Sequence, residues 1–262
     1  MTKLMTIVAA LVLAVAGLST AQAQTIDQLI AKGTIRIGVN SAAPPFSFVN
    51  SSGKVEGYDV DVGNAIAKYL GVKAEFTPYA TAARIPALQS GKIDIVVATL
   101  TPTPARARVV MFTMPYVTFT TNVVAAKSSD VHSFEDLAGK TVSVARGTPQ
   151  EVALVAAAAK STHIARFDND AIAFQALASG QASATVVPAT IFEEFKKAHP
   201  DTKLELKFLV ARQFMSIAVR MDAFELRQWL NTVVSWMRVN GELDKISEKW
   251  TGRPFPKNAP VF

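Results

Sequence analysis

A continuous apolar run in the first half of the chain most constrains the fold. Residues 95–98 contain no polar side chain and lead directly into a segment rich in threonine and proline. A strand without alternation of apolar and polar residues is typical of a parallel strand that is covered on both faces. We therefore expect an α/β fold with helices on both sides of a sheet.

Hydroxyl groups and an arginine follow this strand. Thr99, Thr101 and Thr103 lie at or just beyond its end, Pro104 suits the first turn of a short helix, and Arg106 falls within that helix. In open α/β sheets, ligands bind just past the carboxyl ends of such strands. Hydroxyls, free backbone N–H groups and a guanidinium therefore converge where a carboxylate could dock.

Strand-like and helix-like segments alternate along the rest of the chain, which favours two α/β lobes. Two extended segments, 116–123 and 208–214, are expected to cross between the lobes and to leave a cleft there. Strands are predicted over residues 34–40, 73–79, 94–99, 121–126, 141–145, 163–167, 184–187, 204–209 and 216–221. Helices are predicted over residues 59–70 with Asp59 as N-cap, 85–90, 149–160, 170–179, 189–198 and 223–250, the last interrupted near Asn240 and Gly241.

The N-terminus has the pattern of a secretory signal peptide. Lys3 precedes an apolar run over residues 7–18, and the small-residue signal Ala21-Gln22-Ala23 follows. A transmembrane anchor would need about 20 apolar residues, and this run is shorter. We expect residues 1–23 to be cleaved and the mature chain to lie in the periplasm.

Composition narrows the function further. The sequence has no cysteine, so the fold must be stable without disulfides, which roughly 240 mature residues permit. The net charge is +6, but the basic residues are scattered without interleaved aromatics, which argues against a nucleic-acid partner. The three histidines lie far apart in the sequence and lack the spacing of metal ligands, so no metal site is expected.

A series of motifs resembles the extracellular solute-binding proteins of family 3, the polar amino-acid receptors of bacterial ABC importers. These motifs are TIRIGVN with PPFSF, GKVEGYDVDVGNAIAKYLG, RIPALQSGKIDIVVATLT, TPARAR, FTMPY, SFEDLAGKTVSVARGTPQE and GELDKISEKWTG, in the family's order and spacing. The resemblance covers essentially the whole mature chain. It implies the type II periplasmic binding protein fold, in which two hinge strands join two α/β lobes around a ligand cleft.

The resemblance also implies domain boundaries and partners. We expect residues 24–117 and 215–262 to form lobe 1 and residues 118–214 to form lobe 2. The implied ligand is a small anionic or zwitterionic solute, and the implied protein partner is an ABC permease in the membrane. We expect a monomer and no cofactor.

Site residues of lobe 1 follow from the resemblance position by position. Arg106 matches the arginine that binds the α-carboxylate of the ligand, and Thr101 matches the hydroxyl residue that supports it. Thr99 matches a position that faces the ligand, and Arg84 a second ligand arginine of relatives that prefer acidic ligands. The residues alone also allow a solvated Arg106, a surface ion pair for Arg84 and turn-closing hydroxyls for the threonines.

Two more positions complete the predicted site. Asn40, at the end of the first strand, matches an acidic or polar pocket position, although it could also close a turn. In lobe 2, Thr148 opens an alanine-rich helix whose N-terminal amides form an anion site, with Arg146 nearby.

Three positions depart from the family pattern. Ala43 and Thr81 stand where family members usually present aromatic rings, and Pro188 stands where an aspartate usually binds the α-ammonium. A buried ammonium without a carboxylate partner costs several kcal/mol, roughly, so we hypothesise a ligand without a free α-ammonium, or an acidic ligand. Asp168 or Asp170 could supply the missing carboxylate instead.

Two other classes of function remain open from the sequence. Some relatives are dehydratases and need a general acid in the cleft, but Ile191 occupies the matching position, and Glu193 and Glu194 are out of register. A sensor subunit would use the same cleft as an importer. We expect a binding protein and not an enzyme.

Overall fold

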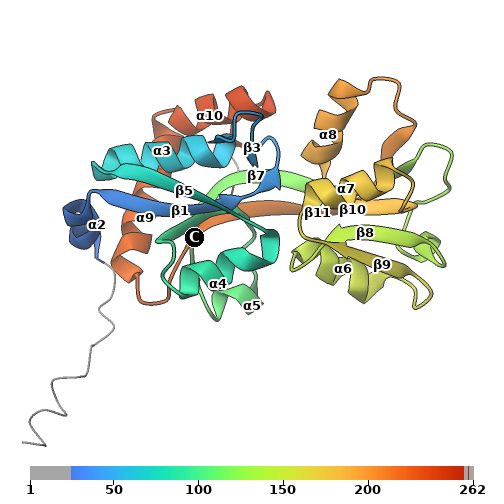
Figure 1. Cartoon of the computed structure of the whole chain (residues 1–262), viewed down its shortest axis with the longest axis horizontal. Coiled ribbons are helices and arrows are strands. Elements are labelled where there is room, and N and C mark those ends of the chain that lie inside the picture. The colour runs from blue at the N-terminus through green and yellow to red at the C-terminus, as the bar shows by residue number, and fades with distance from the viewer. Residues whose placement is uncertain (1–24, 257–258, 260–262) are drawn as a thin grey trace, which may run out of the picture.

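The computed structural model describes residues 25–256 and residue 259 (Figure 1). The predicted signal peptide, residues 1–23, lies outside the described residues. Within the described part of the chain, no helix combines the length and the apolar character needed to cross a membrane.

An eight-stranded sheet runs through the whole molecule (Figure 1). Its strand order is β5-β1-β6-β11-β7-β10-β8-β9, and a second, small sheet has the order β2-β3-β4. The strands are β1 (Thr34–Asn40), β2 (Ala42–Ala43), β3 (Ser47–Val49), β4 (Val55–Glu56), β5 (Lys73–Tyr79), β6 (Ile95–Leu100), β7 (Met111–Ala126), β8 (Thr141–Ala145), β9 (His163–Phe167), β10 (Ala184–Pro188) and β11 (Leu204–Val219).

The sheet consists of two parallel parts joined by two long antiparallel strands. Strand β1 pairs in parallel with β5 and β6, and β8 pairs in parallel with β9 and β10. Strands β7 and β11 pair with each other along their length, and they contact β6 at one end of the sheet and β10 at the other. The two-lobed α/β fold with two connecting strands is thereby confirmed.

The connecting strands are longer than the sequence pattern predicts. The strands expected over residues 121–126, 204–209 and 216–221 are confirmed as strand except at residues 220 and 221, but they are parts of β7 and β11, which are each continuous over 16 residues. Register shifts along the pair let each strand bend from one lobe into the other without ending. The predicted crossings, residues 116–123 and 208–214, lie inside these two strands.

Helices cover both faces of each lobe. In Figure 1, α3 and α10 lie on one side of the first part of the sheet and α4 and α5 on the other. In lobe 1 the helices are α2 (Ile26–Lys32), α3 (Tyr58–Leu70), α4 (Arg84–Gln89), α5 (Pro104–Ala107), α9 (Phe224–Val239) and α10 (Glu242–Thr251), with the 3-10 turn η1 (Thr81–Ala83). In lobe 2 they are α6 (Pro149–Ala157), α7 (Asp170–Ala178) and α8 (Ala189–Ala198), with η2 (Glu135–Leu137).

Most predicted helix starts are confirmed, and one N-cap is wrong. Pro104 and Pro149 stand in the first turns of α5 and α6, as expected. The break between α9 and α10 falls at Asn240 and Gly241, as expected. Asp59 does not cap α3, because the helix begins after Gly57 and the Asp59 side chain turns into the core.

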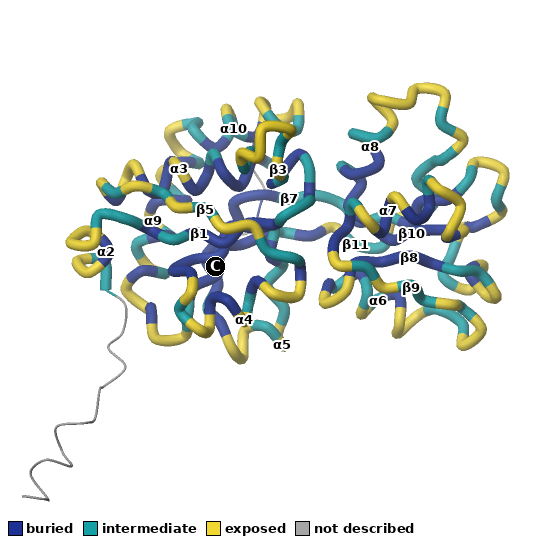
Figure 2. Tube along the Cα trace, viewed as in Figure 1, coloured by how far each residue is buried: buried dark blue, intermediate teal, exposed yellow. Residues whose placement is uncertain are grey.

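The core of lobe 1 lies on both faces of β6. Figure 2 shows that buried residues gather in the central strands and that exposed residues lie on the outer helices and loops. Residues 95–98 are 0 % exposed, which confirms the fully covered strand. Ile95 and Val97 pack in the large cluster with α3 and α9, whereas Val96 and Ala98 pack on the other face with Leu88 of α4.

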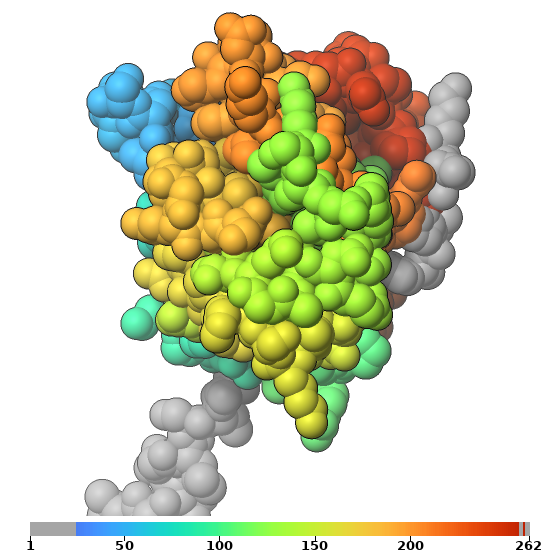
Figure 3. Space-filling model, turned by 90° about the vertical axis from the view of Figure 1, so that its right-hand side faces the viewer, coloured from blue at the N-terminus to red at the C-terminus, as the bar shows by residue number. Residues whose placement is uncertain are grey.

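Lobe 2 has its own core. Val186 of β10 packs against Leu154 of α6 on one face of the sheet, and Val187 packs against Phe174 of α7 on the other. Viewed from its end, lobe 2 fills most of the visible face of the molecule (Figure 3). Because each lobe has its own packed core, we expect the candidate binding site in the region between the lobes.

Candidate functional site

The backbone turns sharply where β6 leaves the core. Thr99 has a φ of 45°, in the left-handed region that β-branched residues rarely enter. Its N–H donates to Tyr116 Oη at 2.9 Å, and that hydroxyl donates to Asp59 Oδ1 at 2.7 Å. Strained backbone that buried side chains hold in place is typical of functional sites.

The Asp59 carboxyl supports this turn from behind. Burial raises its pKa to about 8, although hydrogen bonds from Tyr116 and Ser47 and the charge of Arg84 act in the opposite direction. The carboxyl is 0 % exposed and also accepts a hydrogen bond from Ser47 Oγ at 3.3 Å. Asp59 is therefore a buried structural group that positions Thr99 through Tyr116.

Arg84 lies beneath the same turn and is buried. It is 3 % exposed, donates from Nε to the Thr81 carbonyl oxygen at 2.9 Å, and donates from Nη1 to the Ala98 carbonyl oxygen. Burial lowers its pKa, and the nearby charges of Asp170 and Asp59 partly offset that effect. The surface ion pair that the sequence allowed for Arg84 is therefore wrong.

Arg106 spans the two lobes. Its Nη1 donates to the Thr101 carbonyl oxygen in lobe 1 and its Nη2 to the Gly147 carbonyl oxygen in lobe 2, each at 2.8 Å. Burial and, to a smaller extent, the positive charge of Arg84 lower its pKa to about 10. The half-buried guanidinium of Arg106 therefore lies close enough to the buried one of Arg84 to be repelled by it where the lobes meet.

The Thr101 hydroxyl is part of a chain that leads to the connecting strands. It donates to Gln213 Oε1 at 2.6 Å, and Gln213 Nε2 donates to Thr121 Oγ1 at 2.7 Å. Thr101 is thereby tied to β11 and β7. Sequence reasoning missed Gln213, which carries no motif and is recognisable only from the pairing of the two strands.

Thr148 begins α6 at the edge of lobe 2. Its hydroxyl accepts a hydrogen bond from Glu151 N at 3.2 Å and donates to the Ala145 carbonyl oxygen at 2.7 Å. The Glu151 carboxylate accepts from Gly147 N at 2.7 Å and from Arg166 Nε at 2.6 Å. These bonds fix the turn whose carbonyl oxygen Arg106 contacts.

Asp170 is the buried carboxylate of lobe 2 in this region. It is 7 % exposed at the start of α7 and accepts a hydrogen bond from Gln150 Nε2 at 3.0 Å. Burial raises its pKa to about 6, against the lowering effects of the Arg84 charge and the Gln150 hydrogen bond. Of the two aspartates that the sequence suggested as a replacement acid, Asp170 is the buried one.

Asp168 lies at the rim. Its side chain is exposed and pairs with Arg146, which is exposed as well, at 3.7 Å. Its carbonyl oxygen accepts a hydrogen bond from Thr81 N at 3.2 Å. This is a second hydrogen bond between the lobes, and together with that of Arg106 it shows the lobes in contact.

Asn40 is buried and organises the loop that follows β1. Its backbone N–H donates to Ser47 Oγ at 3.0 Å, and its Oδ1 accepts from Ala42 N at 3.2 Å. Its Nδ2 makes a long hydrogen bond of 3.5 Å to Thr81 Oγ1. The structure thus connects Asn40 with Thr81, the first residue of η1, whose carbonyl oxygen accepts a hydrogen bond from Arg84.

Pro188 and Ala43 lie where the family pattern led us to expect an acid and an aromatic ring. Pro188 is buried at the end of β10, where it pairs with Thr121, and Ala43 is 4 % exposed. Neither side chain offers charge or a stacking surface to a ligand.

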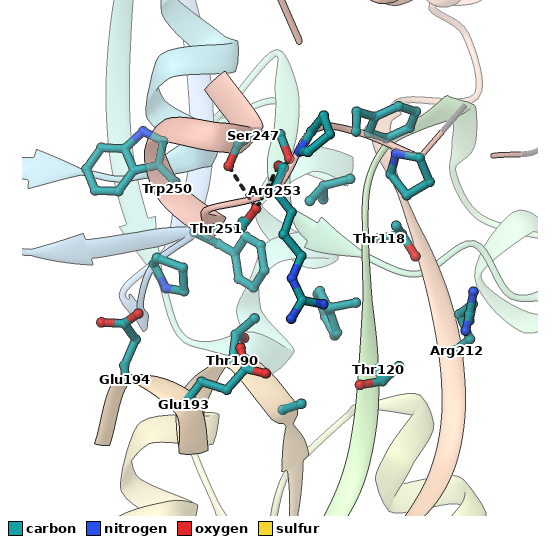
Figure 4. A pocket seen from close by; sticks show the side chains of 18 of the residues that line it. Thr118, Thr120, Thr190, Glu193, Glu194, Arg212, Ser247, Trp250, Thr251 and Arg253 are labelled. Atoms are coloured by element: carbon teal, nitrogen blue, oxygen red, sulfur yellow. Dashed lines mark hydrogen bonds between the residues drawn. The ribbon is translucent and has the colours of Figure 1, made fainter. Parts of the chain in front are cut away.

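Two pockets lie between the lobes, and neither is lined by Arg84, Arg106 or Asp170. One, of about 360 Å³, lies against β11 between Thr101 and Gln150. The other, of about 280 Å³, lies against β7 and is lined from lobe 2 by the first turns of α8. We call the second one the α8 pocket; Figure 4 shows it from close by. The two arginines and Asp170 face protein groups while the lobes are in contact.

Among the residues that the structure describes, no group of three or more histidine, cysteine, aspartate or glutamate side chains could hold a metal ion. The polar groups at the lobe contact are the guanidinium groups of Arg84 and Arg106, the buried Asp170 carboxyl, hydroxyls and backbone amides.

Comparison with known proteins assigns this chain to a protein family. The fold defines a two-lobed α/β protein whose lobes are joined by two long strands and contact each other. The profile of the bacterial extracellular solute-binding proteins, family 3, matches residues 35–253. The chain belongs to this family, which confirms the resemblance seen in the sequence.

Individual relatives agree with this assignment. The L-cystine-binding protein TcyJ of Escherichia coli (strain K12) is 28 % identical over 248 residues, which are 93 % of each chain. The structure of an ancestral arginine-binding protein bound to arginine is 39 % identical, with a TM-score of 0.78 over 84 % of this chain and 99 % of that one.

A further solved structure links the fold to catalysis. The ancestral amino acid-binding protein AncCDT-1, a precursor of cyclohexadienyl dehydratase, is 36 % identical, with a TM-score of 0.77 over 86 % of this chain and 98 % of that one. The named curated relatives are binding proteins.

Proposed function

We propose that this protein captures a small carboxylate-bearing solute, an amino acid or a related organic acid, between its lobes and delivers it to an ABC permease. The convergence of Arg84 and Arg106 supports this proposal most directly. Arg84 is buried and Arg106 is half-buried at the lobe contact, where burial and the neighbouring charge of Arg84 make the Arg106 guanidinium costly to keep charged. A carboxylate bound there would lower this cost.

The charge balance narrows the class of ligand. Arg84 and Arg106 are opposed in this region by Asp170, and Asp59 is engaged behind the turn. Because Pro188 offers no carboxylate, Asp170 is the group that we assign to a ligand ammonium. A zwitterion with a further acidic group, or an organic acid without an ammonium, would complement this set best.

The proposed mechanism is capture followed by closure. The carboxylate would first bind the lobe 1 groups Arg106 and Thr101. Thr99, Arg84 and Asn40 would form the surface of the site beneath the ligand. Rotation about β7 and β11 would then bring Thr148 and the start of α6 over the ligand.

In closing around a ligand, Arg106 would replace its contact with the Gly147 carbonyl oxygen by a contact with the carboxylate. A guanidinium–carboxylate pair is stronger than a guanidinium–carbonyl hydrogen bond, so the carboxylate would displace the Gly147 contact. Closure would then be favoured by the contacts that Thr148 and the start of α6 make with the ligand only when the lobes meet.

Calorimetry tests this proposal directly. Native mass spectrometry would identify any retained solute, and isothermal titration with amino acids and organic acids would rank the ligands. Arg106→Ala should weaken binding about hundredfold, because it removes a charged, partly desolvated contact. Arg108→Ala, at an exposed arginine two residues later, is the matched control and should bind normally. Unchanged affinity in Arg106→Ala would refute the assigned anchor.

Catalysis is the second candidate function because of the likeness to a dehydratase precursor. A dehydratase needs a general acid at the reacting group. Ile191 is buried at the position where dehydratase relatives have a glutamate, and Glu193 and Glu194 line the α8 pocket. We therefore favour binding; dehydration of a cyclohexadienyl substrate by the purified protein would overturn that preference.

Several attributes belong to the same proposal. We propose lobe boundaries at residues 24–117 with 215–262 and at 118–214, cleavage after residue 23, a periplasmic location and a monomeric state. Import is favoured over sensing because relatives of this chain are named as ABC transporter binding proteins for arginine and for glutamine. Size-exclusion chromatography with light scattering, and N-terminal sequencing of the exported chain, test these points.

A further inference from the structure

The α8 pocket contains an arginine and a glutamate from opposite lobes. Arg253, which follows α10 in lobe 1, extends into the pocket towards Thr190 and Glu193 at the start of α8 (Figure 4). Across residues 25–256 and residue 259, no hydrogen bond or ion pair engages the Arg253 guanidinium or the Glu193 carboxylate. By contrast, Glu194 in the same pocket pairs with Lys197 at 2.6 Å.

The start of α8 offers further groups to a ligand. Its N-cap is Pro188, which provides no side-chain hydrogen bond to the first turn. The Thr190 Oγ1 atom is buried and has no hydrogen-bond partner, which is costly unless a ligand or water supplies one. Helix N-termini with free N–H groups and a nearby cation attract carboxylates.

These groups together match one kind of ligand group. Arg253, together with the start of α8, whose cap provides no side-chain hydrogen bond, suits a carboxylate, whereas Glu193 suits an ammonium. We propose that the α8 pocket binds an amino-acid head group, with the carboxylate on Arg253 and the ammonium on Glu193. Its volume of about 280 Å³ is enough for such a group.

The position of the pocket connects this site with the proposed function, on which the inference rests. The pocket includes Ala189, the residue after Pro188, and Pro45, two residues after Ala43. It therefore begins beside the two positions where this chain has lost the family's acid and aromatic ring. The head group could be the far end of a ligand whose first carboxylate lies on Arg106, or a separate amino acid.

Three related ligands distinguish the role of Arg253 from that of Glu193, because they differ in the carboxylate and the ammonium of the second head group. meso-2,6-Diaminopimelate has two head groups, L-lysine lacks its second carboxylate, and 2-aminopimelate lacks its second ammonium. If the pocket takes the far end of one ligand, calorimetry with the mature protein should show that Arg253→Gln weakens binding of diaminopimelate and aminopimelate about tenfold and leaves lysine unchanged. In the same case, Glu193→Gln should weaken diaminopimelate and lysine by a similar factor and leave aminopimelate unchanged.

Controls and stoichiometry complete the experiment. Lys68→Gln, at an exposed cation on α3 of lobe 1, should bind all three probes like wild type. One equivalent of diaminopimelate identifies the far end of one ligand as the occupant. A second equivalent of lysine or aminopimelate, lost in Arg253→Gln or Glu193→Gln, identifies a separate molecule. Both exposed side chains lack partners, so thermal unfolding without probe should match wild type.

The outcomes distinguish this inference from the proposed function. Affinities and stoichiometries unchanged by Arg253→Gln and Glu193→Gln, with binding lost in Arg106→Ala, would overturn the head-group site alone. Failure of the wild type to bind any of the three probes would also overturn it. The proposed function fails separately, if Arg106→Ala keeps the affinity of wild type for whichever solute the protein binds best.

Discussion

At the scale of single residues, Arg84 has two candidate roles that mutation can separate. It supports the Thr99 turn through the carbonyl oxygens of Thr81 and Ala98, and it contributes charge to the proposed ligand site. Arg84→Met should lower the free energy of unfolding by about 3 kcal/mol, because two buried carbonyl groups lose their donor. Urea unfolding measures this loss.

The conservative variant sharpens that test. Arg84→Lys keeps the charge but cannot reproduce the two directions of the guanidinium hydrogen bonds, so it should recover only part of the stability. If Arg84→Met were as stable as wild type but bound the ligand poorly, Arg84 would be a ligand residue without a structural role.

The two buried aspartates predict how stability depends on pH. Asp170 and Asp59 have folded pKa values of about 6 and about 8, above the ordinary value of 3.8. A raised folded pKa gives stability that is fully present below pH about 4 and is lost as pH rises through the folded pKa. Wild type should therefore lose stability in two steps, one complete near pH 6 and one near pH 8.

Asparagine variants assign the two steps. Asp170→Asn should remove the step near pH 6, worth about 3 kcal/mol for a shift of about two units, and Asp59→Asn should remove the step near pH 8. Denaturant unfolding between pH 4 and pH 9 measures both, and Asp168→Asn, at an exposed carboxylate, is the control. A pH profile shared by wild type and Asp170→Asn would show that this carboxyl keeps an ordinary pKa when folded.

The sequence pointed to some residues of the candidate site and not to others for a physical reason. Arg106 and Thr101 stand next to a fully buried strand, so local pattern and resemblance both pointed to them. Asp170 and Gln213 become neighbours of the arginines or of Thr101 only when distant segments meet. Such long-range proximity leaves no periodic signal in the chain, and hence Asp170 was one of two alternatives and Gln213 was missed.

At the scale of elements, helix starts were predictable because local chemistry determines them. Pro104 and Pro149 each follow a threonine whose hydroxyl accepts a backbone hydrogen bond from the first turn. The lengths of β7 and β11 were not predictable, because pairing with each other keeps both strands continuous through segments of weak strand pattern.

The start of α3 gives a prediction at the same scale. Gly57 has a φ of 133°, and a Cβ there would meet the carbonyl group of Phe46, whose oxygen accepts the Asp59 N–H. Gly57→Ala should destabilise the protein by several kcal/mol, roughly, through both clash and backbone strain. Gly53→Ala, where φ is 79° but nothing lies within 4 Å, should cost only about 1 kcal/mol.

Thermal unfolding compares the two alanine variants, and ligand titration adds a functional readout. Because Phe46 and Asp59 connect this helix start with the Thr99 turn, Gly57→Ala should also weaken ligand binding. Equal stability of the two variants would mean that the loop before α3 relaxes without cost.

At the scale of the whole molecule, few bonds hold the lobes together. Among the described residues, hydrogen bonds from Arg106 to Gly147 and from Thr81 to Asp168 join lobe 1 to lobe 2, in addition to the connecting strands. One or two such bonds contribute only about 1 kcal/mol each, so the ligand-free protein should populate open arrangements as well.

Small-angle X-ray scattering tests this expectation. The radius of gyration should be larger for the ligand-free protein than for the ligand-saturated protein, because the ligand adds contacts that exist only when both lobes meet. Arg106→Ala removes a bond between the lobes together with the proposed carboxylate anchor. It should stay expanded at ligand concentrations that compact wild type and Arg108→Ala. Identical scattering of wild type with and without ligand would show that the lobes stay in contact regardless of occupancy, and ligand entry would then require a local opening instead of rotation about β7 and β11.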